Sequence, residues 1–567
     1  MLVLTSIFYK RKIFEMRNIL FICFSLFSLT SNAQTPKSNQ TSTSSKPKLV
    51  VGIMVDQMRW DYINQFKPYF TSQQGFLRFV NEGASCNNNL IPYVPTVTAP
   101  GHASVYTGST PAIHGITGNQ WFDNILQKTV YCVEDPTVMS VGIEGSAAGK
   151  MSPKNMWTST IGDEMKLASN FKSKVYGISI KDRGAILPAG HSANGAFWYD
   201  SKTGKFISST YYGQNLPPWV TEYNGQHRVD SMYAKGWNLS LAKSVYEANC
   251  DEDINAYEST PLGAEQKGFP YNLTQFIGKD YGRIASTPYG NNLVLEMAEM
   301  AIVNEQLGKD DITDLLAISF SSPDYIGHSF GPNSWETMDG YIKLDIQLAQ
   351  LFASLDKQVG KNNYTVFLTA DHAVQHIPAY AKKHHLPGGL INESAIKKEL
   401  NELFVKNSLD TKMISDIGEY YIHFNHDLMD SLHVSQDKLV QLVTNSLEKN
   451  PGILQVVETR KAAIAAIPEA LRERIVNGYS SQRSGDLFIV TKSGYMDGYA
   501  TGTTHGTLYN NDAHIPLLWY GNGIKKGQIN SVNYMTDIAP TISTLLDIQM
   551  PSGSIGKPIL EVLGSKY

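Results

Sequence analysis

Four apolar runs, each followed by charged or polar residues, constrain the fold of this chain more than any other feature. They span residues 48–55, 174–180, 314–320 and 364–369. Continuous apolar runs of this length are typical of strands buried on both faces, as in parallel sheets covered by helices. The carboxyl ends of parallel strands meet at one edge, where open α/β sheets bind their ligands. The sequence therefore predicts an α/β fold with a central, mostly parallel sheet flanked by helices.

The residues that follow these runs are of types that bind metal ions. Asp56 follows the first run, and Asp371 and His372 follow the fourth. Asp324 and His328, after the third, are four residues apart, which on a helical turn places a carboxylate and an imidazole on one face. Singly, each residue is equally well explained as a turn or helix-cap residue. Their expected meeting at one sheet edge favours a metal site.

Groups suited to an anion occur in the same part of the predicted fold. Lys181 and Arg183 follow the second run two residues apart, so in an extended segment they would project to the same side. The alternative is a solvated strand end. Asn119, in a Gly-rich loop, has a side-chain amide that can donate to an oxyanion, unless it is only a turn residue. His505, in a late Gly/Thr loop, supplies a third imidazole.

One hydroxyl is placed to act as a nucleophile. In the stretch 95–108, PTVTAPGHASVYTG, Thr98 lies just ahead of a predicted helix start, and Pro100 suits the first helical turn. The free amides of that turn point towards any anion. A hydroxyl beside a metal ion loses its proton far more easily than free threonine, so Thr98 is predicted to attack. His102 is expected to support the helix and not to bind metal.

The candidate metal ligands comprise three carboxylates and three imidazoles, enough for two sites of three ligands each. They are Asp56, Asp324, His328, Asp371, His372 and His505. Oxygen and nitrogen donors with open coordination positions suit catalytic zinc, so two Zn²⁺ are the predicted cofactors, and an additional structural Ca²⁺ stays open. Two such ions can stabilise both the attacking and the leaving oxygen of a displacement at phosphorus.

Taken in order, these motifs resemble those of the alkaline phosphatase superfamily of two-metal hydrolases. The motifs are the first-strand Asp, PTVTAPGHA, Asp-x-x-x-His, Ala-Asp-His and the late Thr-His-Gly. Asn119 with Lys181-x-Arg183 narrows the resemblance to PafA-type phosphate-insensitive alkaline phosphatases, which use a Thr nucleophile. The resemblance extends from about residue 48 to the C-terminus and implies an alkaline-phosphatase-like fold.

The resemblance also implies a role for each residue of the site. One zinc would be held by Asp324, His328 and His505, and the other by Asp56, Asp371 and His372, with Thr98 at the metals. Thr98 would form a covalent phosphothreonine. Asn119, Lys181 and Arg183 would contact the phosphoryl oxygens.

The phosphate contacts favour small-molecule phosphate monoesters as substrates. A monoester dianion concentrates about two charges on three non-bridging oxygens, which Lys181, Arg183 and Asn119 match better than they match a diester. Three alternatives stay open. A phosphodiesterase or nucleotide pyrophosphatase of the same superfamily would share the metals and Thr98. A sulfatase would need a Cys/Ser-x-Pro-x-Arg context, which the sequence around Thr98 lacks, and a noncatalytic metal- or phosphate-binding protein would show no turnover.

The N-terminus predicts export. Residues 1–33 read as a signal peptide with cleavage near Ala33 and an alternative start at Met16. Residues 34–47 form a polar linker, and residues 48–567 form the catalytic domain. Insertions are expected around 194–289, as a cover over the site, and around 381–478, as a peripheral helical layer. We therefore expect a periplasmic or secreted monomer without a stable membrane span.

Charge and cysteine content restrict the partners and the metal ligands. The formal net charge is −4, and residues 1–33 carry +3, so the mature chain carries −7, which argues against nucleic-acid binding. Beyond the signal peptide, Cys86 and Cys132 are the nearest pair that an oxidising compartment could join, and whether they form a disulfide is left open. The chain has no Cys-x-x-Cys pair, so a metal would be held by His and carboxylate.

Overall fold

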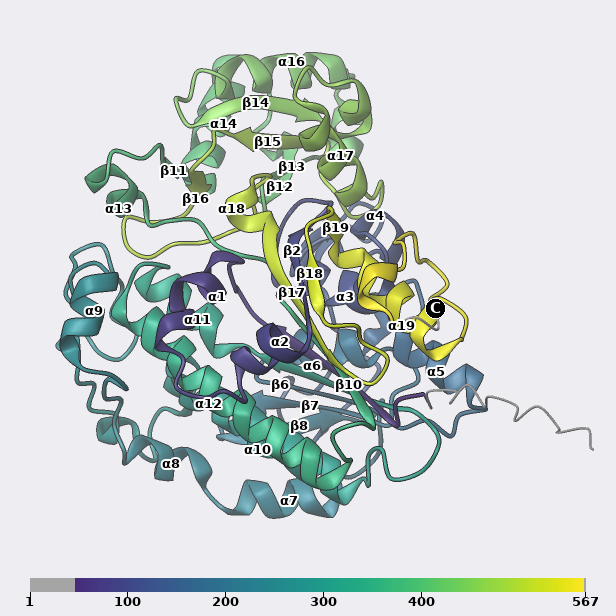
Figure 1. The fold of residues 1–567 in the computed structure, drawn as a ribbon. Coiled ribbons are helices and arrows are strands. Elements are labelled where there is room, and N and C mark those ends of the chain that lie inside the picture. Colours follow the sequence, from purple (N-terminus) through teal and green to yellow (C-terminus); the bar gives the residue numbers. More distant parts are fainter. Residues whose placement is uncertain (1–45, 565–567) are drawn as a thin grey trace, which may run out of the picture. The chain divides into compact units, whose positions relative to one another are not determined.

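The computed structural model describes residues 46–564. The predicted signal peptide and residues 34–45 of the predicted linker lie outside the described residues. A central sheet organises the described part of the chain (Figure 1). Among residues 46–564, no helix has both the length and the apolar character that crossing a bilayer requires.

Eleven strands of residues 46–564 form the central sheet, in the order β18-β2-β17-β10-β1-β9-β6-β7-β8-β5, with β19 beside β2. Their bounds are β1 Leu49–Val55, β2 Ala84–Leu90, β5 Ser140–Val141, β6 Val175–Ser179, β7 Gly195–Asp200, β8 Lys205–Ser209, β9 Asp314–Phe320, β10 Tyr364–Thr369, β17 His514–Gly521, β18 Gly527–Ile529 and β19 Asn533–Tyr534. β10, β1, β9, β6 and β7 run parallel, whereas β17 is antiparallel to β10 and β2. The predicted mostly parallel central sheet is confirmed.

The four apolar runs become the four adjacent strands β10, β1, β9 and β6 at the centre of this sheet. Val55 at the end of β1 is opposite Phe320 at the end of β9, and Met54 is opposite Thr369 at the end of β10. Since these strands are parallel and in register, their carboxyl ends form one edge.

Helices cover both faces of the sheet (Figure 1). The α-helices of residues 46–564, including those outside these two layers, have the bounds α1 Asp61–Phe66, α2 Phe76–Glu82, α3 Thr98–Thr107, α4 Pro111–His114, α5 Ile161–Ala168, α6 Asp182–Ala189, α7 Pro218–Gly225, α8 Arg228–Tyr233, α9 Lys243–Asn249, α10 Tyr289–Asn304, α11 Ser322–Phe330, α12 Trp335–Gln358, α13 Pro378–Lys383, α14 Glu393–Lys406, α15 His426–Ser431, α16 Gln436–Leu447, α17 Glu469–Gly478, α18 Asn510–Ala513 and α19 Ile538–Leu546.

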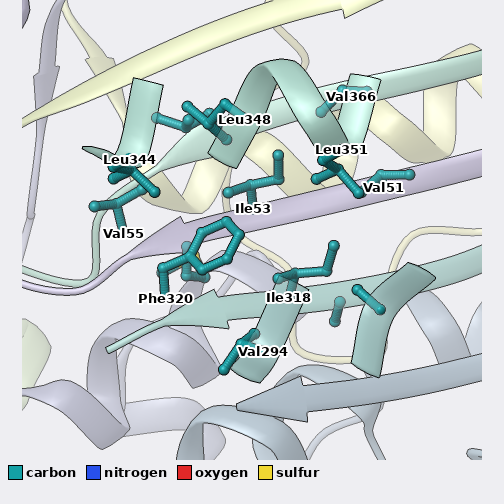
Figure 2. Close-up of a cluster of buried hydrophobic side chains, with 14 of the residues drawn as sticks. Val51, Ile53, Val55, Val294, Ile318, Phe320, Leu344, Leu348, Leu351 and Val366 are labelled. Atoms are coloured by element: carbon teal, nitrogen blue, oxygen red, sulfur yellow. The ribbon is translucent and has the colours of Figure 1, made fainter. Parts of the chain in front are cut away.

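One face of the sheet packs against α12 and α10. Figure 2 shows Leu344, Leu348 and Leu351 of α12 lying over β1, and Val294 of α10 beside β9. Spacings of three and four residues place the three leucines on one face of the helix, while alternate residues of each strand point to that side. On the other face, Tyr106 of α3 packs on Phe367 of β10, with ring centroids 5.7 Å apart. This packing holds the helix that begins at Thr98 against the sheet.

The range 194–289, expected to be a covering insertion, begins instead with two strands of the central sheet. β7 pairs in parallel with β6, and β8 pairs with β7. All six residues of β7, GAFWYD, are buried, as expected of a strand inside the sheet. The rest of the range contains α7, α8 and α9 and packs into the main hydrophobic core through Tyr233, Trp237 and Tyr271.

Most of the range 381–478, expected to be a helical layer, belongs to an α/β subdomain. Its antiparallel sheet has the order β12-β13-β15-β14. The bounds are β12 Ile414–Gly418, β13 Tyr421–Phe424, β14 Ile453–Glu458 and β15 Leu487–Thr491. Helices α14, α16 and α17 pack with this sheet (Figure 1, green). The hydrophobic cluster of the unit is separate from the main core. Because short strands alternate with charged helices here, the local composition masks the sheet. We call this unit, residues 393–491, the inserted subdomain.

Cys86 and Cys132 are free thiols and form no disulfide. Cys86 lies in β2 within the core around the central sheet, whereas Cys132 lies in a separate hydrophobic cluster. Their nearness in sequence therefore does not correspond to contact in the fold.

Candidate active site

The edge formed by the carboxyl ends of the central strands carries the predicted site residues. Asp56 directly follows β1, and Asp371 and Lys181 each follow their strand, β10 and β6, after one residue. Asp324 and His328 lie on α11, which begins after a single residue beyond the end of β9. Side chains that are far apart in sequence therefore meet at one place.

Lys181 lies at the centre of this group. Its Nζ atom is 2.6 Å from Asp56 Oδ2, 2.7 Å from Asp324 Oδ2 and 3.4 Å from Thr98 Oγ1. Burial by itself would lower the pKa of Lys181, but the adjacent carboxylates of Asp324 and Asp56 raise it above its ordinary value. Lys181 is therefore a permanent cation beside the hydroxyl of Thr98.

Asp324, His328 and His505 form one compact group of donor atoms. Asp324 Oδ1 is 3.1 Å from His328 Nε2 and 3.8 Å from His505 Nε2, and the three donor atoms all lie within 4.8 Å of one another. Burial alone would raise the pKa of Asp324, but His328 and then Lys181 hold it well below its usual range. A carboxylate that stays ionised next to two imidazoles is a typical arrangement for a divalent cation.

A second group comprises Asp56, Asp324 and His372, whose donor atoms also lie within 4.8 Å of one another. Asp371 is adjacent, with Oδ2 3.5 Å from His372 Nε2. Asp324 thus takes part in both groups, whereas the resemblance divided the ligands between two separate sets. Burial, and then the neighbouring Asp56, raise the pKa of Asp371 well above its usual value, so a positive charge is needed to keep these carboxylates ionised together.

Backbone carbonyls orient the three imidazoles. The Nδ1 atoms of His328, His372 and His505 lie 2.8, 3.0 and 2.8 Å from the carbonyl oxygens of residues 503, 373 and 96. Donation from Nδ1 leaves Nε2 with its lone pair directed at the carboxylates, as in histidines that bind metals. Burial lowers the pKa of His372 to about 4 and that of His505 well below its usual value, which favours the neutral, ligating form. For His328, burial alone would lower the pKa, but Asp324 outweighs it and raises the pKa.

The donor set fits divalent cations. Asp56 Oδ1 and Asp371 Oδ2 are buried and accept no hydrogen bond within residues 46–564. Buried carboxylate oxygens are costly without a partner, and a cation would satisfy them. Carboxylate and imidazole donors that leave coordination positions open suit a catalytic metal.

Thr98 is the first residue of α3 and is 2% exposed. Its Oγ1 atom lies 3.5 Å from His372 Nε2, in addition to its contact with Lys181. The first turn of α3 approaches the sheet edge closely at Gly101, where an added Cβ would lie 2.4 Å from the carbonyl oxygen of Asp371. His102 is held by its Nδ1, 2.9 Å from the carbonyl of Thr98, and by its Nε2, 2.9 Å from Ser319 Oγ.

Asn119 lies beside the N-terminus of α3. Its Oδ1 atom accepts a hydrogen bond of 2.9 Å from the backbone N–H of Ala99. The oxygen of the side-chain amide is therefore occupied by its hydrogen bond to the helix, and the NH₂ group of the same amide can donate to another acceptor. This orientation suits a contact with an oxygen of a phosphoryl group bound at Thr98.

Lys181 and Arg183 do not lie in one extended segment, contrary to the expectation from their spacing. Lys181 is extended, but α6 begins at Asp182, so Arg183 is helical. Arg183 Nη1 donates to the hydroxyl of Tyr131 at 3.1 Å, away from the carboxylates that Lys181 contacts. The helix starts at once because residues 182–189 pack on β6 and β7, a tertiary effect that spacing does not reveal.

Further side chains that were not expected from the sequence contact the site residues. Gln57 Nε2 donates to Asp324 Oδ1 at 2.6 Å, Tyr131 contacts Arg183, the ring of Tyr325 lies 5.3 Å from Lys181 Nζ, and Glu419 Oε1 accepts from the N–H of Asn119 at 3.0 Å. Gln57 and Tyr325 directly follow Asp56 and Asp324 in the sequence, and this adjacency could have indicated their place at the site. Tyr131 and Glu419 come from distant segments and carry no such signal.

Comparison with known proteins agrees with this geometry. The family of type I phosphodiesterases/nucleotide pyrophosphatases matches residues 50–512. Alkaline phosphatase PafA of Elizabethkingia meningoseptica is 45% identical over 93% of this chain and 96% of its own length. Alkaline phosphatase PhoV of Synechococcus elongatus is 44% identical over 96% of this chain and 99% of its own length.

Solved structures of alkaline phosphatase PafA share the fold. The wild-type structure is 46% identical and superposes with a TM-score of 0.89 over 92% of this chain and 99% of that chain. Another carries substitutions of a Thr, an Asn, a Lys and an Arg, spaced along that chain at the same intervals as Thr98, Asn119, Lys181 and Arg183. The resemblance to PafA-type enzymes is thereby confirmed, and the chain belongs to the type I phosphodiesterase/nucleotide pyrophosphatase family of the alkaline phosphatase superfamily.

Proposed function

We propose that this chain is an alkaline phosphatase that releases inorganic phosphate from phosphate monoesters through a phosphothreonine at Thr98. The observation that carries this proposal is the position of Thr98 Oγ1, at the start of α3 and within 3.5 Å of both Lys181 Nζ and His372 Nε2. A nucleophilic hydroxyl is thus buried beside a cation and a group of metal-type donors. Metal dependence follows from the PafA and PhoV relatives together with these donor groups.

Two zinc ions are the metals we assign to the site. Asp324, His328 and His505 would hold one ion, and Asp56, Asp371 and His372 the other, with Thr98 next to both. Bound zinc would supply Lewis-acid stabilisation of the deprotonated hydroxyl and of the leaving oxygen. The carbonyl-bound Nδ1 atoms support this assignment, as do the buried oxygens of Asp56 and Asp371 that accept no hydrogen bond within residues 46–564.

The chemistry then takes two displacements. Thr98 Oγ1 attacks phosphorus while the bond to the leaving oxygen breaks, and the alcohol departs with a proton. Water attacks the phosphothreonine in the second step, which releases phosphate and restores the hydroxyl. Lys181, Arg183 and the amide of Asn119 bind the non-bridging oxygens in both steps, where charge-assisted contacts strengthen as charge develops.

A monoester fits these contacts better than a diester, although the chain belongs to a family described by its phosphodiesterases. A diester has one charge less and a second organic group, so it gains less from Lys181 and Arg183. The spacing shared with the substituted positions of the PafA structure supports the assignment of Thr98, Asn119, Lys181 and Arg183 to one site.

Export completes the proposal. The enzyme would act in the periplasm or outside the cell, after cleavage near Ala33 removes residues 1–33, and it would act as a monomer. The N-terminal sequence of the mature protein and its mass in solution test these two statements.

The double variant Lys181→Ala, Arg183→Ala tests the substrate assignment. Charge-assisted contacts contribute about 1.5–3 kcal/mol each, so kcat/KM for an aryl phosphate monoester should fall by about 10²–10⁴. The fall for the matching methyl aryl diester should be at least about tenfold smaller, because a diester has less charge to stabilise. The variant Lys397→Ala, Lys398→Ala removes the same charge from an exposed face of α14 and should leave both rates unchanged. Equal losses on both substrates would contradict the assignment.

Thr98→Ala tests the covalent step. Acid-quenched wild-type enzyme should carry a phosphoryl group on the peptide containing Thr98, and the variant should carry none and lose turnover. Full turnover by Thr98→Ala would exclude the phosphothreonine.

A further inference from the structure

The tip of one hairpin in the inserted subdomain reaches the catalytic edge. Glu419 and Tyr420 form the two-residue turn between β12 and β13, and both have positive φ, +50° and +68°. Such turns prefer Gly, Asn or Asp, because other side chains are strained in this conformation. Such strain persists only where the surroundings impose it, and it often marks a functional position.

Glu419 contacts the loop that carries Asn119. Its Oε1 atom accepts the backbone N–H of Asn119 at 3.0 Å. Gly118 permits this approach, since an added Cβ at that position would lie 2.0 Å from Glu419 Oε2. Asn119 in turn accepts the N–H of Ala99, next to Thr98. A continuous chain of hydrogen bonds thus runs from the inserted subdomain to the first turn of α3.

Tyr420 holds the same tip in place through a second set of contacts. Its N–H donates to Glu393 Oε1 at 2.7 Å, and its hydroxyl accepts from the N–H of Asp497 at 3.0 Å. Its ring lies against Gly506, the residue after His505, where an added Cβ would be 3.0 Å from the ring. The tip therefore contacts segments that hold both the proposed phosphate-binding and the proposed metal-binding residues.

We propose that Glu419 is a positioning residue that holds Asn119 in the orientation needed for contact with the phosphoryl group. The inserted subdomain would then contribute to recognition of the phosphate monoester, although none of its residues touches the reacting atoms. This inference rests on the proposed role of Asn119. Burial raises the pKa of Glu419 to about 8. Near neutral pH, the oxygen that accepts the hydrogen bond from Asn119 therefore matters more for positioning than a full negative charge on Glu419.

A double-mutant cycle between residues 419 and 119 tests the proposal. Glu419→Ala should lower kcat/KM for an aryl phosphate monoester by about 5–30-fold, which corresponds to the loss of one hydrogen bond of about 1–2 kcal/mol. In the Asn119→Ala background the same change should cost less than about twofold, because the positioned group is gone. Glu419→Gln, which keeps the acceptor oxygen, should restore most of the activity.

Two further variants separate positioning from folding. Gly118→Ala should reproduce the defect of Glu419→Ala, because the added methyl group displaces an intact carboxylate. Asp416→Ala, in β12 of the same hairpin, removes a carboxylate that no site residue contacts and should leave kcat/KM unchanged. Melting temperatures of all variants report whether the hairpin still folds.

The outcomes are distinct. If Asn119→Ala leaves monoester turnover intact, the proposed phosphate contact of Asn119 fails and this inference fails with it. If Asn119→Ala is impaired but Glu419→Ala is not, only the inference is overturned. An equal loss from Glu419→Ala with and without Asn119 would also overturn it, since the effect would then not pass through Asn119.

Discussion

Removing the hydroxyl of Tyr131 is expected to weaken phosphate recognition through Arg183. Tyr131 ends β4, residues Lys128–Tyr131, and its hydroxyl donates to Asp182 Oδ1 at 2.6 Å while it accepts from Arg183 Nη1 at 3.1 Å. The direct ion pair between Arg183 and Asp182 is longer, at 3.9 Å. Tyr131→Phe removes both hydrogen bonds and keeps the ring, so the guanidinium loses its fixed orientation.

The magnitude follows from these contacts. A hydrogen bond to a charged group contributes about 1.5–3 kcal/mol when it is buried. The side chain of Arg183 is 19% exposed, so water recovers part of this energy, and we take about 1–2 kcal/mol. An arginine side chain that no neighbour holds in place also loses up to about 2 kcal/mol of rotamer entropy when a ligand orders it. This entropy cost would further weaken phosphate binding in Tyr131→Phe. The expected loss in kcat/KM for an aryl phosphate monoester is therefore about 5–30-fold.

Steady-state kinetics of Tyr131→Phe, Arg183→Ala and the double variant check this prediction. The loss from Tyr131→Phe should shrink to less than about twofold once Arg183 has been replaced by alanine. Tyr176→Phe is the matched control, because it removes a hydroxyl that donates to Glu305 at 2.7 Å elsewhere on the sheet. A loss of the same size with and without the Arg183→Ala substitution would refute the reasoning, as would an equal loss from Tyr176→Phe.

Stability, pH and metal content provide further tests. Arg78 is 1% exposed and donates two hydrogen bonds of 2.9 Å to the partly exposed Asp356. Arg78→Met should therefore lower the free energy of unfolding by about 2–3 kcal/mol in urea titrations. An unchanged unfolding midpoint would contradict this prediction. Burial raises the pKa of Glu336 in the folded protein to about 8, whereas the pKa of a glutamate in the unfolded chain is about 4.3. The contribution of Glu336 to the stability of the fold is therefore complete below about pH 4 and is lost as the pH rises to about 8. The titratable groups near it include Tyr271, Glu258, Asp253, Asp339 and Cys250. Glu336→Gln should flatten the decline of the melting temperature over this range, and an equally steep decline would count against the assignment. Dialysis against a chelator should abolish turnover and lower the melting temperature. Added Zn²⁺ should restore both the turnover and the melting temperature better than Mg²⁺ or Ca²⁺. Full activity of protein shown to be metal-free would exclude metal dependence.

Much of the central sheet is predictable from short apolar runs, because strands buried on both faces need apolar residues at every position. The runs 314–320 and 364–369 coincide with β9 and β10. The strands of the inserted subdomain are not predictable in this way. They are short and lie between charged helices, so their pairing depends on partners far away in sequence.

Local spacing was a poor guide to the orientation of side chains. Lys181 and Arg183 point to different partners because a helix begins between them, and packing of that helix on the sheet determines where it begins. The sequence left a disulfide between Cys86 and Cys132 open, and the structure shows two free thiols buried in different clusters.

The sequence by itself determined the chemistry available to this protein: carboxylates, imidazoles, cations and one hydroxyl at the ends of apolar runs. Parallel strands must end at one edge, so the types of donor and their common location follow from the pattern of the chain. Only the tertiary structure decided which donors meet, including the sharing of Asp324 between two groups and the approach of Glu419 to Asn119. Asp324 and Asp56, like Glu419 and Asn119, are separated by hundreds of positions. The geometry of such contacts is set by strand order and packing, which no local stretch of sequence encodes.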